Sequence, residues 1–283
     1  MPTIEFTSSL PHAADDVFAW HARPGAFQRL VPPWAPVRLE SFEGIREGDR
    51  AVLRIGIRSL ALRWVAEHHD VVEGRQFCDR QVQGPFAHWD HTHRFEPDKT
   101  APESASTLVD HIDYALPGGA IGGVLSSLVE PELERQFRYR HRITHRDLAL
   151  HEQYNPEGRS LTVAVSGSSG LVGSALCAFL STGGHRVKRI VRSGPTGEDE
   201  ILWNARTNTV ETEKLEGVDA VVHLAGENVF GWWTEAKKKR IDQSRTDGTR
   251  LLAEALAELY DPPEVFVSAS AVGYSGDHGA DVV

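Results

Sequence analysis

Apolar and polar residues alternate along most of the first half of the chain. Apolar side chains recur at every second position in four stretches, residues 51–57, 60–66, 87–95 and 108–116. This period of two predicts strands with one buried face, and the face predicted to be buried includes Ile57, Leu60 and Leu62. Strands of this kind that follow one another closely form an antiparallel sheet.

Two stretches interrupt the alternation. Residues 12–30 predict two short helices separated around Pro24-Gly25, and residues 123–150 carry apolar side chains near the spacing of one long helix. Pro131 lies within that helix, where it would either kink the helix or begin a fresh first turn. The order of strand, short helices, meander and closing helix predicts an α+β domain in which a curved sheet grips a helix.

The pattern changes after residue 160. Apolar runs at 161–165, 185–191, 200–203, 218–224 and 264–267 predict strands, with helical segments at 174–182 and 234–259 between them. This rhythm is typical of an α/β fold with a doubly wound parallel sheet. The predicted organisation is therefore an α+β domain at 1–152, a polar linker at 153–160 and an α/β domain at 161–283.

Composition narrows the class of protein. The 283 residues are 40% apolar and 25% charged, which excludes a disordered chain, and no apolar run approaches the roughly 18–20 residues needed to cross a bilayer. The formal charge of -10 argues against a nucleic-acid partner. With only Cys78 and Cys177 and no signal segment at the N-terminus, we expect a cytoplasmic protein without a membrane partner.

A glycine-rich segment follows the first strand of the predicted α/β domain. Gly167, Gly170 and Gly173 are spaced as G-x-x-G-x-x-G between that strand and a helix. In a dinucleotide site, such glycines permit the turn, the approach of backbone N–H groups to a pyrophosphate, and close packing of the helix. A glycine triplet alone also fits a plain turn, but its place between a strand and a helix favours a nucleotide site.

The end of the second strand indicates which dinucleotide binds. Sites that prefer NAD usually carry an acidic residue there for the ribose 2′-hydroxyl. This chain has Arg192, and its next acidic residue is Glu198. A guanidinium can hold a 2′-phosphate through two hydrogen bonds, so we expect NADP in preference to NAD.

Four sequence motifs in 161–283 resemble the extended short-chain dehydrogenase/reductase superfamily, and more closely its uncharacterised epimerase-family NAD(P)-binding proteins. They are GSSGLVG at 167–173, HLAG at 223–226, DGTRLL at 247–252 and SASAVGY at 268–274. Some of these proteins carry a START-like domain in front. The segments PHAADDVFAWHARPGAFQRLVPPW and GPFAHWDHTHRF resemble such a domain, of the polyketide cyclase/dehydrase type, which often encloses an apolar cavity.

The resemblance and the glycine pattern together predict the site residues. The expected cofactor-binding residues are Gly167, Ser168, Gly170, Leu171, Val172, Gly173, Arg192, His223, Leu224, Ala225, Gly226 and Ser268. The resemblance also implies that Ser270 is the catalytic residue that hydrogen-bonds a substrate carbonyl. Arg245 stands where the wider superfamily commonly has asparagine.

The catalytic tyrosine and lysine of that superfamily, spaced Tyr-x-x-x-Lys, do not occur in this sequence. The sequence also stops just past the fifth strand, so we expect a C-terminally incomplete Rossmann-like domain and an inactive fragment. Two functions stay open. The first is an NADP-dependent oxidoreductase or epimerase acting on a small-molecule substrate, and the second is a non-catalytic sensor of NADP(H) and an apolar ligand. The alternative to both is a degenerate fold that binds neither.

Histidines in the predicted sheet raise the question of a metal site. His91 and His93 share one strand face with Trp89, but no cysteine or carboxylate at ligand spacing completes a tetrahedral set. The sequence therefore favours ordinary strand residues and predicts no metal. Four aromatic residues could line the cavity or fill the core: Trp64, Trp89, Tyr114 and Phe137. The arginines of the long helix, Arg140 among them, are expected on a solvated or domain-facing surface.

Overall fold

The computed structural model describes residues 2–57, 60–118 and 120–270, except for the side chains of 120–128. The chain forms two compact units, Met1–Gly158 with Ser181–Gly183, and Arg159–Leu180 with Gly184–Val283. The division after Gly158 falls inside the segment predicted as a linker. The first two residues of that segment instead complete a helix that ends at Tyr154.

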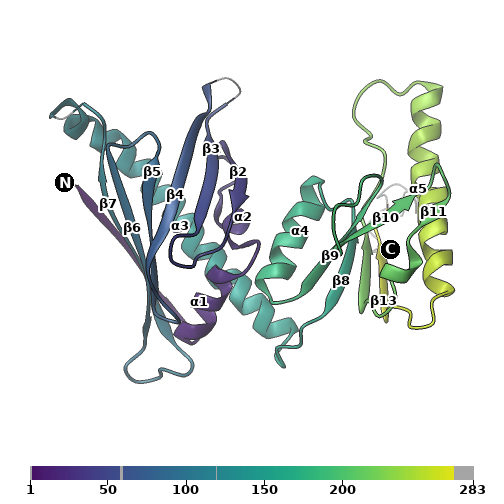
Figure 1. The fold of residues 1–283 in the computed structure, drawn as a ribbon, viewed down its shortest axis with the longest axis horizontal. Coiled ribbons are helices and arrows are strands. Elements are labelled where there is room, and N and C mark those ends of the chain that lie inside the picture. Colours follow the sequence, from purple (N-terminus) through teal and green to yellow (C-terminus); the bar gives the residue numbers. More distant parts are fainter. Residues whose placement is uncertain (1, 58–59, 119, 271–283) are drawn as a thin grey trace, which may run out of the picture. The chain divides into compact units, whose positions relative to one another are not determined.

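The first unit is built on a seven-stranded antiparallel sheet of order β1-β7-β6-β5-β4-β3-β2 (Figure 1). Its strands are β1 (Thr3–Leu10), β2 (Val37–Phe42), β3 (Arg50–Ile55), β4 (Leu62–Val72), β5 (Gln76–Gln83), β6 (His88–Pro97) and β7 (Ser106–Ala115). From β2 to β7 each strand pairs with the next one in the chain, which is the meander that the alternation predicts.

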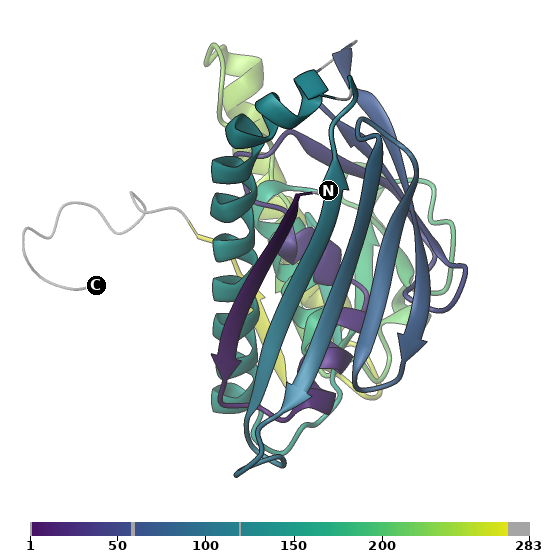
Figure 2. The ribbon, with the colours of Figure 1, turned by 90° about the vertical axis from the view of Figure 1, so that its left-hand side faces the viewer.

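Three helices accompany this sheet: α1 (Ala14–Ala22), α2 (Ala26–Leu30) and α3 (Ala120–Tyr154). Gly25 separates α1 from α2 with a φ of 95°, a left-handed conformation that glycine adopts without strain. Figure 2 shows α3 running along the sheet beside β1. The helix continues through Pro131, so this proline does not begin a separate helix.

Part of the face predicted to be buried lies in solvent. Ile57, Leu60 and Leu62 are 68%, 83% and 55% exposed. They lie at the tip of the β3–β4 hairpin, where Ile55 and Leu62 form the last pair. A hairpin tip has water on both faces, so alternation does not bury its side chains. Ala51 and Leu53, further along β3, are buried as expected.

The second unit holds a six-stranded sheet of order β11-β10-β9-β8-β12-β13. Its strands are β8 (Thr162–Ser166), β9 (Arg186–Val191), β10 (Glu200–Asn204), β11 (Thr209–Val210), β12 (Ala220–His223) and β13 (Val265–Ser268). All neighbours are parallel except β11, which runs antiparallel to β10. The short helix η2 (Thr212–Lys214) follows β11.

One long helix covers each face of this parallel sheet. Cys177 of α4 (Leu171–Thr182) packs with Val163 and Val165, whereas Leu252 of α5 (Glu235–Ala257) packs in the cluster that holds Ala164. Figure 1 shows α4 and α5 on opposite sides of the sheet. The side chain of Thr234 caps α5 by accepting a hydrogen bond from Lys237 N, as its sequence position predicts. Within residues 2–270, where described, no helix is long and apolar enough to cross a membrane.

Candidate functional site

The glycine turn after β8 leaves no room for side chains. Gly167 has a φ of 67°, and a Cβ there would lie 2.9 Å from Leu224 O. A Cβ on Gly173 would lie 2.2 Å from Gly167 O, so α4 packs directly on the backbone of the turn. These contacts explain two of the three glycines in the motif, because any larger residue would separate the turn from its neighbours.

Helix α4 begins at the end of this turn. Gly170 N donates to Gly167 O, and Ser174 N donates to Gly170 O as the first bond of the helix. The N–H groups of a first helical turn have no partner within the helix, and they carry the positive end of the helix dipole. Leu171 and Val172 lie there with side chains 92% and 65% exposed. The turn thus presents backbone donors that suit an anion.

A buried serine holds the glycine turn beside the loop that follows β12. Ser166 Oγ accepts hydrogen bonds from Leu224 N at 3.0 Å and Ala225 N at 3.1 Å, and it lies 2.7 Å from His223 Nδ1. The hydroxyl therefore donates its proton to that nitrogen. The His223 side chain is 2% exposed, and burial lowers its pKa, so the neutral imidazole points into the unit rather than toward solvent.

The sequence analysis did not single out Ser166. It is the last residue of β8, and only the pairing of β8 with β12 brings it beside His223. A small hydroxyl residue just before a glycine turn is the one local signal that could have found it. His223, in contrast, was predicted as a cofactor-binding residue. In the structure its buried ring contacts Ser166 Oγ, the atom that holds the loop after β12.

Replacing Ser166 with alanine should weaken the second unit. The change leaves Ala225 N and one imidazole nitrogen without their partner, whereas Leu224 N keeps a bond to Ser166 O at 3.3 Å. We therefore expect a loss of about 2–4 kcal/mol in unfolding free energy. Chemical denaturation of the purified variant measures it. Ser174→Ala, which removes an exposed hydroxyl from α4, is the matched control. A loss no larger than that of the control would contradict this role for Ser166.

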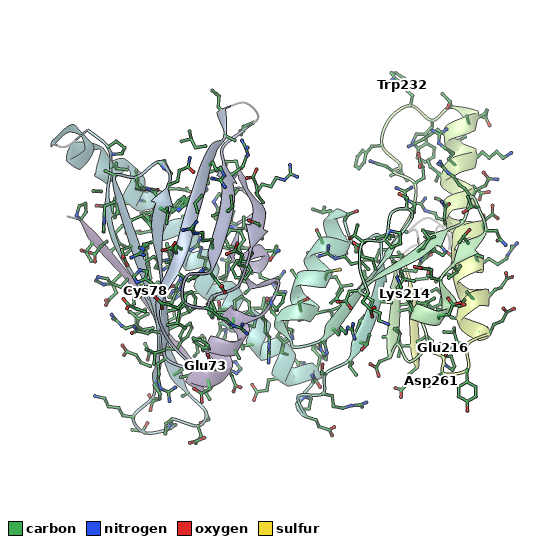
Figure 3. The ribbon with its side chains drawn as sticks, in the orientation of Figure 1. Glu73, Cys78, Lys214, Glu216, Trp232 and Asp261 are labelled. Atoms are coloured by element: carbon green, nitrogen blue, oxygen red, sulfur yellow. The ribbon has the colours of Figure 1, made fainter. Side chains whose placement is uncertain are left out.

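Charged residues fix the loop after β12 to α5. Glu227 pairs with Lys237 Nζ at 3.1 Å and Arg240 Nε at 3.4 Å, and these hydrogen bonds lower the pKa of Glu227. Arg245 donates to Glu227 O at 3.4 Å, and a Cβ added to Gly226 would touch the Arg245 guanidinium. Beyond Glu227 the loop carries Trp232, which is 93% exposed and points away from the strands in Figure 3.

The other predicted residues lie at the same end of the strands. Arg192 follows β9 directly and is exposed, and its carbonyl oxygen accepts a hydrogen bond from Asn204 Nδ2 at 3.2 Å. Ser268 ends β13 opposite His223, and Ser270 follows it as an exposed residue. The remainder of the SASAVGY motif, including Tyr274, lies outside the described residues.

The first unit contains an apolar cavity of about 370 Å³. Of the four aromatic residues that could line a cavity or fill the core, Trp64, Trp89 and Phe137 line this cavity, whereas Tyr114 is fully buried in the core beside it. Arg140 also lines it, which corrects, for this residue, the prediction of a solvated or domain-facing surface. Burial lowers the pKa of Arg140, and its guanidinium lies 4.7 Å from the centre of the Phe137 ring.

A cluster of histidines and carboxylates reaches this cavity through Asp79, His91 and His93. Asp79 Oδ2 lies 3.2 Å from His91 Nδ1 and 3.3 Å from His93 Nε2. Asp110 Oδ1 lies 3.0 Å from His91 Nε2 and 2.6 Å from His93 Nδ1, and Asp110 Oδ2 lies 2.6 Å from His141 Nε2. The sequence analysis found no carboxylate to accompany the two histidines. Sheet register supplies one, because Asp79 of β5 pairs directly with His91 of β6.

The cluster is electrostatically coupled. Burial acts to lower the pKa of His91, but the charges and hydrogen bonds of Asp79 and Asp110 raise it to about 8. Burial acts to raise the pKa of Asp79, yet the nearby imidazoles hold it well below its usual range. For Asp110 as well, burial acts to raise the pKa, and the nearby imidazoles hold it well below its usual range. Both carboxylates are therefore ionised although burial opposes their charge.

Comparison with known proteins gives two family matches in the two halves of the chain. Residues 163–281 match the NAD dependent epimerase/dehydratase family, and residues 10–142 match the polyketide cyclase / dehydrase and lipid transport family. The crystal structure of the nucleoside-diphosphate sugar epimerase from Corynebacterium glutamicum covers both halves, with 29% identity and a TM-score of 0.77 over 99% of this chain and 57% of that chain. The second half of the chain thus belongs to the epimerase family, and its first half is a START-like domain.

Two curated relatives each match about two fifths of this chain. An epimerase family protein of Mycobacterium leprae is 41% identical over 120 residues, 42% of this chain and 38% of the relative. The human epimerase family protein SDR39U1 is 33% identical over 117 residues, 40% of this chain and 38% of the relative. The chain thus spans about two fifths of the length of these curated relatives.

Proposed function

We propose that the second unit is a Rossmann-like domain that binds NADP(H) over the glycine turn. The parallel strands have the order β10-β9-β8-β12-β13. From β8 the chain adds β9 and β10 on one side and then returns to add β12 and β13 on the other side, so the strand order reverses between β8 and β12. Ligands of such sheets bind at the carboxyl ends of the strands beside that reversal. The turn after β8 and the loop after β12 meet there, with Gly167 against Leu224.

The single observation that carries this proposal is the packing of Gly173 on Gly167. It leaves the first turn of α4 in contact with bare backbone, so a pyrophosphate meets N–H groups instead of side chains. Arg192 supports NADP, because it stands exposed at the strand end where a 2′-phosphate would lie. The match to an NAD-dependent family supports a dinucleotide without deciding between the two.

The experiment is a titration of the chain with NADPH and NADH, followed by tryptophan fluorescence. Arg192→Ala should weaken NADPH binding by about 10–100-fold, the equivalent of one charge-assisted contact, and leave NADH binding within about twofold. Arg250→Ala removes an exposed arginine of α5 and serves as control. Equal losses for both nucleotides would contradict the role of Arg192, and no binding of either would contradict the nucleotide site itself.

We propose further that the START-like domain binds an apolar small molecule in its cavity, and that the whole protein is an NADP(H)-dependent oxidoreductase or epimerase. The support for the ligand is the cavity of about 370 Å³, most of whose lining side chains are apolar. A non-catalytic sensor would share both sites. Turnover of NADPH with a panel of carbonyl and sugar substrates supports the enzyme, whereas NADPH binding that changes the affinity of the cavity for its ligand without turnover supports the sensor.

A further inference from the structure

The strongest unassigned feature is the place where Asp79, His91 and His93 converge. These side chains come from β5 and β6, and one atom from each lies within 4.8 Å of the other two. Asp79 Oδ2 lies 3.2 Å from His91 Nδ1 and 3.3 Å from His93 Nε2. Donors about 2.0–2.1 Å from a zinc ion at tetrahedral angles lie about 3.3–3.4 Å from one another, so these distances match a shared ion.

Hydrogen bonding alone explains this cluster poorly. All four ring nitrogens of His91 and His93 lie within 3.3 Å of a carboxylate oxygen, and an ionised carboxylate only accepts. Protons in all four places require two imidazolium ions whose ring centroids are 3.8 Å apart. The two side chains are only 2% and 10% exposed, so that repulsion would be weakly screened. One divalent cation in place of two protons keeps the charge and leaves both rings neutral.

We propose that Asp79, His91 and His93 bind a divalent transition-metal ion, with zinc as the reference case. The donor set of two imidazoles and one carboxylate is one that zinc and iron(II) accept. Among the described residues, a second group of suitable composition is His69, Asp70 and Cys78, but Asp70 there is exposed. The first group alone of these two lines the cavity.

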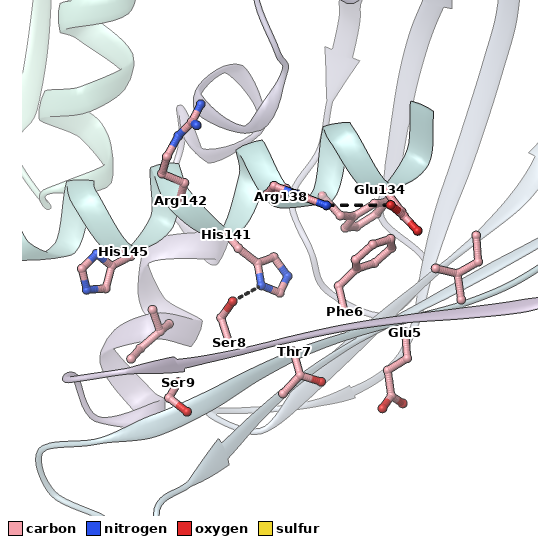
Figure 4. Close-up of a pocket in the computed structure, with 13 residues that line it drawn as sticks. Glu5, Phe6, Thr7, Ser8, Ser9, Glu134, Arg138, His141, Arg142 and His145 are labelled. Atoms are coloured by element: carbon pink, nitrogen blue, oxygen red, sulfur yellow. Dashed lines mark hydrogen bonds and ion pairs between the residues drawn. The ribbon is translucent and has the colours of Figure 1, made fainter. Parts of the chain in front are cut away.

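The surroundings of the three ligands resemble a supporting outer shell. Asp110 Oδ1 accepts from His91 Nε2 and lies 2.6 Å from His93 Nδ1, so one carboxylate orients both rings from behind. His141 Nε2 donates to Asp110 Oδ2, and His141 Nδ1 bonds Ser8 Oγ at 2.8 Å. Figure 4 shows this last pair, with His141 on α3 and Ser8 on β1 turned toward each other. Metal-bound histidines usually have such a partner on the second nitrogen.

Three protein ligands leave one coordination position, and the cavity lies on that side because all three ligands line it. We expect water there, or the carbonyl or hydroxyl oxygen of an otherwise apolar cavity ligand, which the metal would polarise. This inference concerns the first unit only, so its test is independent of nucleotide binding in the second unit.

The test uses the full chain, treated with a chelator and then titrated with Zn²⁺ or Co²⁺. We expect one equivalent to bind, and Zn²⁺ to raise the melting temperature of the first unit. Bound Co²⁺ should give visible absorption bands of nitrogen and oxygen ligands without a thiolate charge-transfer band, which separates this site from the one that contains Cys78.

Variants locate the ion. Asp79→Asn and His93→Gln should each lower metal affinity by more than the 10–100-fold expected for Asp110→Asn, which keeps all three ligands but loses their support. His88→Gln changes an exposed histidine of the same strand, and His69→Gln removes a member of the second group, so both should bind like the wild type. Melting curves in chelator show that each variant is folded.

The proposal fails if the wild-type chain binds neither ion, or if Asp79→Asn and His93→Gln bind as tightly as His88→Gln. It also fails if His69→Gln abolishes binding, or if bound cobalt shows a thiolate band, because the ion would then lie at the second group. If one of these variants does not fold in chelator, Asp110→Asn takes its place in the comparison. A metal affinity of Asp110→Asn equal to that of the wild type would also overturn the proposal.

Discussion

Gly173→Ala is expected to reduce NADPH affinity by at least about 100-fold, equivalent to about 2.7 kcal/mol. The added methyl carbon would stand 2.2 Å from Gly167 O and 3.0 Å from Ser168 Cα, both backbone atoms that cannot rotate away. Helix α4 would have to move outward by about an ångström or more, since non-bonded carbon atoms rest at about 3.5–4.0 Å. Its first N–H groups would then leave the position that we assign to the pyrophosphate.

The control for this substitution is Gly197→Ala. A Cβ on Gly197 meets nothing within 4 Å, and the residue lies in the same unit between β9 and β10. We expect its NADPH affinity to stay within about twofold of the wild type, a free-energy change below about 0.5 kcal/mol. Gly173→Ala should also unfold more easily by about 1–3 kcal/mol, as overpacked sites do. Unchanged nucleotide binding in Gly173→Ala would remove the observation on which the proposed nucleotide site depends.

Acid should destabilise the first unit through His21. Burial lowers the pKa of this histidine to about 3, although Val17 O accepts from its Nδ1 at 2.8 Å. The unfolded chain binds a proton near pH 6.5, whereas the folded chain does not until about pH 3. Stability contributed by the neutral ring is therefore complete above pH 6.5 and is lost as the pH falls toward 3. The full loss is about 5 kcal/mol, or about 1.4 kcal/mol per pH unit.

The slope of stability against pH isolates this effect. His21→Leu removes the titrating ring, so the variant should lose about 1.4 kcal/mol less per pH unit than the wild type between pH 6 and pH 4. Denaturation followed by tryptophan fluorescence measures it, because Trp20 contacts the His21 ring. His88→Leu replaces an exposed histidine and should keep the wild-type slope. Equal slopes for all three proteins would refute the assignment, even if His21→Leu is less stable at every pH.

Local sequence chemistry predicted the parts of the molecule that depend on neighbours in the chain. The spacing of Gly167, Gly170 and Gly173 placed a tight turn between a strand and a helix, and the structure has that turn. The helix expected over residues 234–259 does begin at this point, with Thr234 as its cap. In each case the deciding contact joins residues a few positions apart, which a single sequence displays directly.

The contacts that the sequence could not supply join residues that are far apart. Asp79 reaches His91 only because β5 and β6 pair in one particular register, and His141 reaches Asp110 from a helix that begins after the last strand of the sheet. Ser166 meets His223 across 57 positions. Period-two alternation says which face a residue occupies, but it does not say which strand lies beside it.

The buried hydroxyl of Ser166 constrains its own replacement. The side chain is fully enclosed, accepts from two amides and donates to an imidazole, all through one oxygen. Alanine would lack the oxygen, and threonine would add a methyl group at a fully buried position. Position 166 therefore tolerates few other residues, for a reason that lies in the packing of the turn and the loop. A relative that carries another residue there should have a differently built loop after the fourth parallel strand.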